Sequence, residues 1–194
     1  MGLPTVFVRL TGCPLRCGYC DTTYAFQGGE WFDLQAILAA VAKYPTRHVC
    51  VTGGEPLAQK ACLELLSQLC DAGYDVCLET SGALDVGAVD ARVARIVDVK
   101  TPGSGEVERN LWSNLEMLAP HDEVKFVLVD AADYRWAVEV LARHRIKGRA
   151  EVLFSPAYGR LAARDLAEWI LRDGLDVRMQ IQLHKHLWGE ESGR

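Results

Sequence analysis

Three cysteines stand close together in the segment GCPLRCGYCDTTYAF, residues 12–26. Cys13, Cys17 and Cys20 follow the spacing C-x₃-C-x₂-C, and the next cysteine, Cys50, lies in an apolar run. Structural zinc sites are closed by four ligands, and a [4Fe–4S] cluster normally takes four thiolates. Three thiolates leave one coordination position open, which a catalytic metal site needs and a structural one avoids. The spacing therefore indicates a catalytic metal centre.

Two other interpretations of the cysteines stay open at this stage. The thiols could be incidental, although three cysteines in eight loop positions is far from random usage, or a distant His or Cys could complete a closed zinc site. The other four cysteines stand singly in apolar patterns, and we expect small buried side chains at Cys50, Cys62, Cys70 and Cys77. No secretion signal is visible, so we expect free thiols and a cytoplasmic location.

The composition is that of an ordinary globular protein. The chain has 194 residues, of which 49% are hydrophobic and 24% charged, and its formal net charge is −5. The negative charge and the absence of a basic block argue against a protein whose main task is to grip a nucleic-acid backbone. No apolar run has the length of a membrane-spanning helix, so we expect no membrane partner.

The elements that must position the cysteines alternate between strand and helix. Apolar periodicity predicts strands at 5–10, 47–54, 75–82, 95–103, 123–130, 150–157 and 178–183. It predicts helices at 32–44 with Asp33 as cap, at 57–73 closed by Gly73, after Asn110, at 134–144 and at 161–174. A closed (β/α)₈ barrel needs about 250 residues. We therefore expect an α/β fold with a mostly parallel sheet in an incomplete (β/α) barrel, as one domain over 1–188 with a polar tail at 189–194.

The polar residues of interest follow the ends of the predicted strands. Cys13 to Thr22 follow the first strand, and later strands end at 52–55, 80–82, 100–105 and near His184. The loops at the carboxyl ends of parallel strands build the active site of βα folds. The pattern predicts one shared site.

The cysteine loop after a first strand resembles the radical S-adenosylmethionine superfamily, as does the turn TGGEP at 52–56. A closer resemblance is to the 7-carboxy-7-deazaguanine synthase family. It is carried in order by PTVFVRLTGCPLRCGYCDTTYAF, VTGGEPLAQ, ETSG, VDVKTPGSG and QLHK, from Pro4 to Lys185.

The resemblance implies that Cys13, Cys17 and Cys20 hold a [4Fe–4S] cluster whose open iron binds S-adenosylmethionine. One electron then cleaves this cofactor to methionine and a 5′-deoxyadenosyl radical. Matching family positions imply cofactor contacts from Tyr19, Cys20, Asp21, Gly54, Asp98, Val99, Lys100 and Ser155. Glu79, Thr80 and Ser81 are expected beside the cofactor. The glycines of TGGEP are expected to let the backbone approach its amino group.

The resemblance also implies a substrate, 6-carboxy-5,6,7,8-tetrahydropterin, which the family converts to 7-carboxy-7-deazaguanine and ammonia for queuosine and other 7-deazapurines. Substrate contacts are expected from Arg9, Thr52 and His184, and a Mg²⁺ contact from Thr22. A guanidinium at position 9 suits a carboxylate, and strand alternation separates Phe7 and Arg9 from Val6 and Val8. The implied partners are a second copy of the chain and a flavodoxin or ferredoxin electron donor.

Two other functions remain open from the residues. A radical-generating activase of a partner protein would share the triad, and an iron–sulfur electron carrier or a zinc-binding module would need four closed ligands.

The sequence also departs from the family, whose members usually have an earlier strand with a Ser/Thr-Leu-Gln-Gly-Glu stretch. We expect this chain to lack that segment, unless its start is set too late, and another segment would then have to supply those substrate contacts. Six residues follow Trp188, so no role is expected for a terminal carboxylate.

Overall fold

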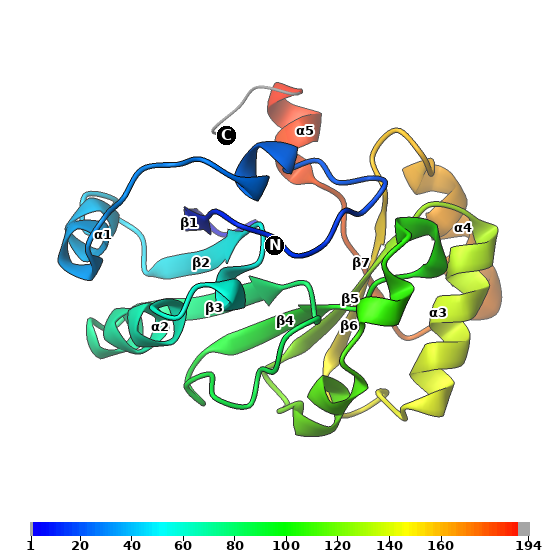
Figure 1. Ribbon diagram of the computed structural model, residues 1–194. Coiled ribbons are helices and arrows are strands. Elements are labelled where there is room, and N and C mark those ends of the chain that lie inside the picture. Colours follow the sequence, from blue (N-terminus) through cyan, green and yellow to red (C-terminus); the bar gives the residue numbers. More distant parts are fainter. Residues whose placement is uncertain (1, 190–194) are drawn as a thin grey trace.

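The computed structural model describes residues 2–189 and contains one sheet of seven strands (Figure 1). The strands are β1 Thr5–Leu10, β2 His48–Gly53, β3 Asp75–Thr80, β4 Ala94–Asp98, β5 Glu123–Leu128, β6 Glu151–Pro156 and β7 Arg178–Met179. Each strand pairs in parallel with the next in chain order. Within the described residues β1 and β7 are the two edges, so the expected incomplete barrel is confirmed.

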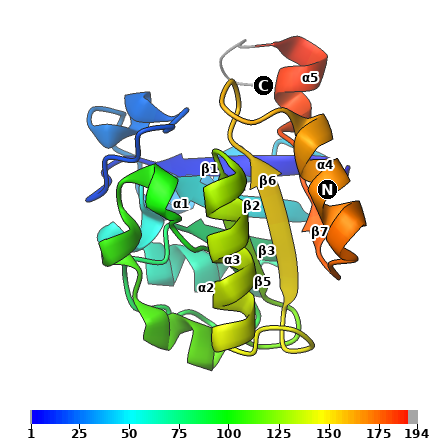
Figure 2. The ribbon, with the colours of Figure 1, turned by 90° about the vertical axis from the view of Figure 1, so that its right-hand side faces the viewer.

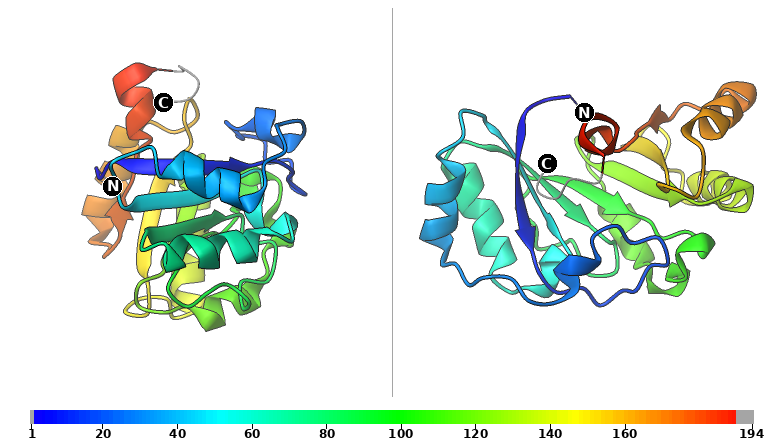
Figure 3. Two further views of the ribbon diagram at one scale, coloured as in Figure 1. Left: turned by 90° about the vertical axis from the view of Figure 1, so that its left-hand side faces the viewer. Right: turned by 90° about the horizontal axis from the view of Figure 1, so that it is seen from above.

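Helices connect the strands along the outer side of the curved sheet (Figures 2 and 3). They are α1 Leu34–Val41, α2 Cys62–Asp71, α3 Ala131–Arg143 and α4 Ala163–Asp173, whereas α5 Leu183–Trp188 follows β7 and does not connect two strands. Short 3₁₀ turns cover Thr23–Phe26, Pro56–Ala58, Pro102–Ser104, Val107–Arg109 and Trp112–Met117. The predicted cap is confirmed, since the Asp33 carboxylate accepts from the Ala36 N–H at 2.7 Å. The predicted stop at Gly73 is confirmed by its positive φ of 85° after α2.

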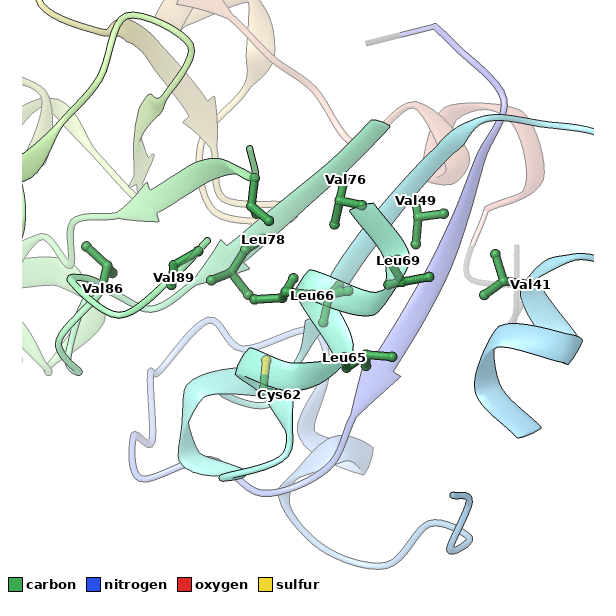
Figure 4. Close-up of a cluster of buried hydrophobic side chains, with 12 residues drawn as sticks. Val41, Val49, Cys62, Leu65, Leu66, Leu69, Val76, Leu78, Val86 and Val89 are labelled. Atoms are coloured by element: carbon green, nitrogen blue, oxygen red, sulfur yellow. The ribbon is translucent and has the colours of Figure 1, made fainter. Parts of the chain in front are cut away.

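Two apolar clusters hold the helices against the sheet. In the first, Leu65, Leu66 and Leu69 of α2 pack on Val49 and other buried residues of β2 and β3 (Figure 4). In the second, α3 and α4 cover alternate residues of β5 and β6, which include Phe126 and Phe154. Because side chains alternate along a strand, the residues between these apolar ones point to the opposite, inner face.

Three expectations about local structure are wrong. The predicted strand 178–183 pairs only at Arg178–Met179, because an edge strand has a single neighbour and the chain leaves β6 after Gln180. His184 consequently lies in α5 and does not follow a strand end. The predicted strand 95–103 ends at Asp98 and is followed by a 3₁₀ helix at Pro102–Ser104. The short helix predicted after Asn110 is present, as the 3₁₀ helix Trp112–Met117.

The cysteine expectation is partly confirmed. Cys50 and Cys62 are buried, whereas Cys70 and Cys77 are only half-buried. Cys70 packs at the border of the first cluster, and Cys77 stands opposite Cys50 on the inner face, which the helices do not cover.

Among the described residues, no helix combines the length and apolar character needed to cross a membrane. The division into one domain with a polar tail stays a prediction. Residues 190–194, most of that tail, lie outside the described residues.

Candidate active site

Polar side chains form a row along the inner face of the sheet, near the carboxyl ends of the strands. Leu10, Val51 and Leu78 pack in the first apolar cluster, and Phe126, Phe154 and Met179 in the second. Their neighbours in sequence therefore face inward. Each of the strands β1 to β6 contributes one inward-facing polar residue to the row, and the residue directly after β7 contributes another. The row consists of Arg9, Thr52, Glu79, Asp98, Lys125, Ser155 and Gln180.

Charges of opposite sign pair within this row. The Lys125 ammonium bonds the Glu79 carboxylate, which also accepts from the Thr52 hydroxyl at 3.4 Å. Lys125 holds the pKa of Glu79 below its ordinary value despite the burial. Lys100 and Asp98 form a second pair at 2.7 Å; although burial disfavours the ammonium, Asp98 holds the pKa of Lys100 above its ordinary value. The inner face therefore presents fixed charges where a polar ligand can be oriented.

Two expected site residues do not present buried polar groups on the inner face. Arg9 is exposed, and its guanidinium carbon is 5.8 Å from the centre of the Tyr24 ring. Val99 packs its side chain in the second apolar cluster. A cofactor contact from position 99 would therefore come from its backbone.

The glycines of TGGEP bring the end of β2 against the cysteine loop. The N–H groups of Gly54 and Glu55 donate to the carbonyls of Leu10 and Gly12 at 2.9 and 2.7 Å. A Cβ on Gly53 would overlap the Leu10 carbonyl, and a Cβ on Gly54 would overlap that of Gly12. These glycines therefore let the backbone after β2 lie in direct contact with the backbone at the start of the loop that carries the cysteines.

Glu55 secures this turn from inside, a role that sequence reasoning missed. Its side chain is 0% exposed. It accepts from the backbone N–H groups of Leu57 at 3.0 Å and Ser81 at 2.7 Å, and from the hydroxyls of Thr80 and Ser81. Thr80 and Ser81, expected beside the cofactor, therefore direct their hydroxyls to Glu55. In the sequence, the two neighbouring hydroxyl residues Thr80 and Ser81 were the pattern that could have pointed to a carboxylate acceptor.

The cysteine loop is fixed at several points. Arg16 donates to the carbonyls of Cys13 and Leu15, both at 2.7 Å, and its own backbone N–H donates to Glu106 at 2.5 Å. The Gly18 N–H donates to the Ser104 carbonyl at 2.9 Å. The three cysteines are free and half-buried. Burial raises the pKa of Cys17 to about 11, so its free thiol is protonated at neutral pH.

The cysteine loop offers three free thiols, and thiolates are the ligands that hold iron–sulfur clusters, so the chemistry of this donor set fits a [4Fe–4S] cluster. Within residues 2–189, no three His, Cys, Asp or Glu side chains are grouped closely enough to hold one metal ion.

Buried polar atoms on the same face indicate where a ligand belongs. Within the described residues, four buried side-chain atoms have no hydrogen-bond partner: Tyr19 Oη, Asp98 Oδ1, Ser155 Oγ and Gln180 Oε1. A buried polar atom without a partner costs about 1–3 kcal/mol. Three of these residues are those expected to contact the cofactor, and the fourth was missed. Their placement fits a polar ligand held between the cysteine loop and β4 to β7.

The segment at the start of α5 closes onto the cysteine loop. The Gln182 amide donates to the Asp21 carboxylate, which also accepts from the Thr22 hydroxyl at 2.8 Å. Lys185 lies 3.6 Å from Asp21, and its ammonium stands 4.3 Å from the centre of the Tyr158 ring. Burial opposes the charge of Asp21, but the bonds from Gln182 and Thr22 hold its pKa below the ordinary value. Half-buried His184 lies within this segment.

Comparison with known proteins agrees with this geometry. Residues 7–103 match the family model of the Radical SAM superfamily. The 7-carboxy-7-deazaguanine synthase of Chlorobaculum tepidum is 45% identical over 98% of this chain and 88% of its own length, and that of Koribacter versatilis is 42% identical over 98% and 91%. The chain belongs to the 7-carboxy-7-deazaguanine synthase family. The crystal structure of QueE from Escherichia coli, at 25% identity, superposes with a TM-score of 0.75 over 93% of this chain and 86% of that one.

This membership confirms the predicted family and enzyme class, a radical S-adenosylmethionine enzyme that acts as a carbon–nitrogen lyase in 7-deazapurine biosynthesis. Enzymes of this superfamily use a [4Fe–4S] cluster and S-adenosylmethionine. The alternatives of an activase, an electron carrier or a zinc-binding module are set aside. SuiB of Streptococcus suis bound to its precursor peptide, 12% identical with a TM-score of 0.66, shares the fold alone.

Proposed function

We propose that this synthase converts 6-carboxy-5,6,7,8-tetrahydropterin to 7-carboxy-7-deazaguanine and ammonia at the inner face of the sheet. The observation that carries the proposal is the meeting of three free thiols, a row of fixed charges and the partnerless polar atoms at one end of one sheet. Such a site can hold a cluster, a charged nucleoside cofactor and a carboxylated substrate together.

Cys13, Cys17 and Cys20 would hold the cluster, and with S-adenosylmethionine it would supply the carbon radical that removes a substrate hydrogen. Tyr19, Asp98, Lys100 and Ser155 lie on the inner rim beside the loop and would orient the cofactor, with Cys20, Asp21, Gly54 and the backbone of Val99. The task of these side chains is orientation, because the reactive chemistry belongs to the cofactor.

Arg9 would bind the substrate carboxylate. A permanently charged planar guanidinium matches a carboxylate in a bidentate manner, and the exposed Arg9 is free to turn to a ligand. Thr52 stands beside it as its partner in the β1–β2 register. His184 would contact the substrate from α5, which the Asp21 contacts hold over the same end of the sheet.

Mg²⁺ would be bound by the Thr22 hydroxyl. Thr22 and the adjacent Asp21 carboxylate present oxygen donors, the ligand type that Mg²⁺ prefers, and substrate oxygens and water would complete six positions.

A homodimer and a reducing partner complete the proposal. Trp31 and Phe32 are 100% and 57% exposed, and a second copy would bury such apolar side chains. Arg16 and Arg160 are exposed and donate to carbonyls of the cysteine loop, so they place positive charge where an acidic flavodoxin or ferredoxin would deliver an electron. Free thiols at all seven cysteines suit the reducing cytoplasm.

The test is anaerobic turnover by the reconstituted protein with strong reductant, S-adenosylmethionine, Mg²⁺ and the carboxylated tetrahydropterin. We expect a product with the mass of 7-carboxy-7-deazaguanine, equimolar ammonia, and suppression of idle cofactor cleavage by the pterin. Cofactor cleavage without any pterin turnover would overturn the proposed substrate. One zinc without labile sulfide would overturn the cluster assignment.

A further inference from the structure

Gln180 occupies a position on the inner face that the proposed reaction has not yet used. Its backbone N–H donates to the Phe154 carbonyl at 2.9 Å, which places it beside Ser155 across the β6–β7 edge. Met179 and Phe154 both pack in the second apolar cluster. By alternation, Gln180 and Ser155 therefore point side by side to the inner face.

The side-chain oxygen of Gln180 lacks the hydrogen-bond partner that its burial demands among the described residues. This Oε1 is buried without a hydrogen bond within residues 2–189, as are Tyr19 Oη, Asp98 Oδ1 and Ser155 Oγ on the same rim. Gln182, two residues further on, shows that an amide in this segment can find a partner in the protein, since it donates to Asp21. The partner of Gln180 is therefore to be sought in a ligand.

We propose that Gln180 binds the edge of the adenine ring of S-adenosylmethionine. A glutamine amide offers an acceptor and a donor side by side, and adenine presents the complementary 6-amino donor next to the N7 acceptor, whereas the deaminated base presents two acceptors on that edge. The Ser155 hydroxyl, which can donate and accept, would bond the same nucleoside. This inference rests on the proposed function, in which Tyr19, Asp98 and Ser155 surround the cofactor.

A pterin edge also offers N–H donors beside acceptors, but the placement favours the cofactor. Of the proposed substrate contacts, Arg9 and Thr52 stand on β1 and β2, at the other edge of the strand order from β7, and His184 lies on α5. The immediate neighbour of Gln180 is Ser155, a proposed cofactor residue.

The experiment measures binding to the anaerobically reconstituted protein by calorimetry, with S-adenosylmethionine and with its deaminated analogue, which carries an oxo group in place of the adenine amino group. We expect Gln180→Leu to weaken S-adenosylmethionine binding about tenfold, the loss of about 1.4 kcal/mol in one good hydrogen-bonded contact. We also expect the variant to lose the preference of the wild type for the adenine form. Gln35→Leu on the exposed face of α1 is the matched control and should bind both as the wild type does.

Cluster absorbance and circular dichroism verify that each variant is folded. If Gln180→Leu does not fold, Gln180→Glu, which keeps the side-chain volume, carries the same test, because a carboxylate cannot donate to the ring nitrogen. Unchanged affinity and discrimination in the folded variant would overturn the inference, as would a change confined to the KM of the pterin. A Gln180-dependent preference for adenine in a protein that turns over no pterin would overturn the proposed substrate and leave this inference standing.

Discussion

At the scale of single residues, the buried carboxylate of Glu55 does more for the site than its place in a turn motif suggests. It joins the end of β2 to the end of β3 through Thr80 and Ser81. The adjoining N–H of Glu55 donates to Gly12 in the cysteine loop. The side chain and the backbone N–H of this one residue thus fix three loops that must keep their mutual positions when a cluster is bound.

We predict that Glu55→Gln lowers the free energy of unfolding by about 2 kcal/mol, because an amide cannot accept from all the donors that the carboxylate satisfies. Urea unfolding of the cluster-free protein measures the change, and iron content after reconstitution should fall with it. Glu139→Gln on the exposed face of α3 is the control. Equal stability of the two variants would contradict the role of Glu55.

At the scale of elements, the turn after β2 and the cysteine loop form one unit because their backbones touch. Gly54 has no room for a Cβ, which would also lie 2.9 Å from the Ala25 carbonyl. Gly18, inside the same loop, has room for a side chain, since a Cβ there would lie 4.0 Å from its nearest neighbour, the Ser104 carbonyl oxygen.

We therefore predict that Gly54→Ala lowers the yield of reconstituted cluster severalfold, whereas Gly18→Ala retains it. Backbone atoms must shift to admit a methyl group at position 54, and the cysteines move with them. Iron and labile sulfide per chain are the measurements. A Gly54→Ala protein with full cluster content would refute the need for this close approach.

The second element-scale feature is the attachment of α5 to Asp21. We predict that Gln182→Glu loosens α5, since a second carboxylate faces Asp21 where an amide donor stood. Lys185 is 13% exposed and paired with Asp21, so trypsin should cleave after it several times faster in the variant. The apparent Mg²⁺ requirement for turnover should rise as well, because Asp21 orients the Thr22 hydroxyl.

His186→Gln, on the exposed side of the same helix, serves as the control for α5. Cleavage rates that are the same in wild type, Gln182→Glu and His186→Gln would show that Asp21 does not hold the helix.

At the scale of the whole molecule, an ion pair remote from the active site joins the middle strands. The Arg95 side chain on β4 lies 2.5 Å from Asp122, directly before β5, and both are largely buried. Asp122 also accepts from the backbone N–H groups of Arg95 and Ala119, at 2.8 and 2.7 Å. Burial opposes its charge, but the bonds from Arg95 hold the pKa of Asp122 below the ordinary 3.8.

The sign of the pH effect follows from that lowered pKa. The stability that Asp122 contributes is complete above the unfolded value and is lost as the pH falls through the folded one. We predict that the unfolding free energy of the wild type falls more steeply below about pH 4 than that of Asp122→Asn. Urea unfolding between neutral pH and pH 2 tests this, and parallel pH curves would contradict it.

The amino-acid sequence by itself determined the alternation of strands and helices, the parallel sheet and the three ligands of the proposed cluster. These features are local, because the periods of two and about 3.6 residues and the cysteine spacing are complete within short windows. Arg9 on the face opposite Val6 and Val8 follows from the same period.

Only the tertiary structure decided which polar groups are satisfied and which are kept for a ligand. Asp21 meets Gln182 across 161 residues, and Glu55 meets Ser81 across 26, because the curved sheet brings all the strand ends to one rim. The contacts of Thr80 and Ser81 with Glu55 depend on that long-range packing, as does the burial of Gln180 Oε1 without a hydrogen-bond partner among residues 2–189. The strand that was expected to reach residue 183 ended at Met179 for the same reason, since pairing at an edge depends on a neighbour that no local window contains.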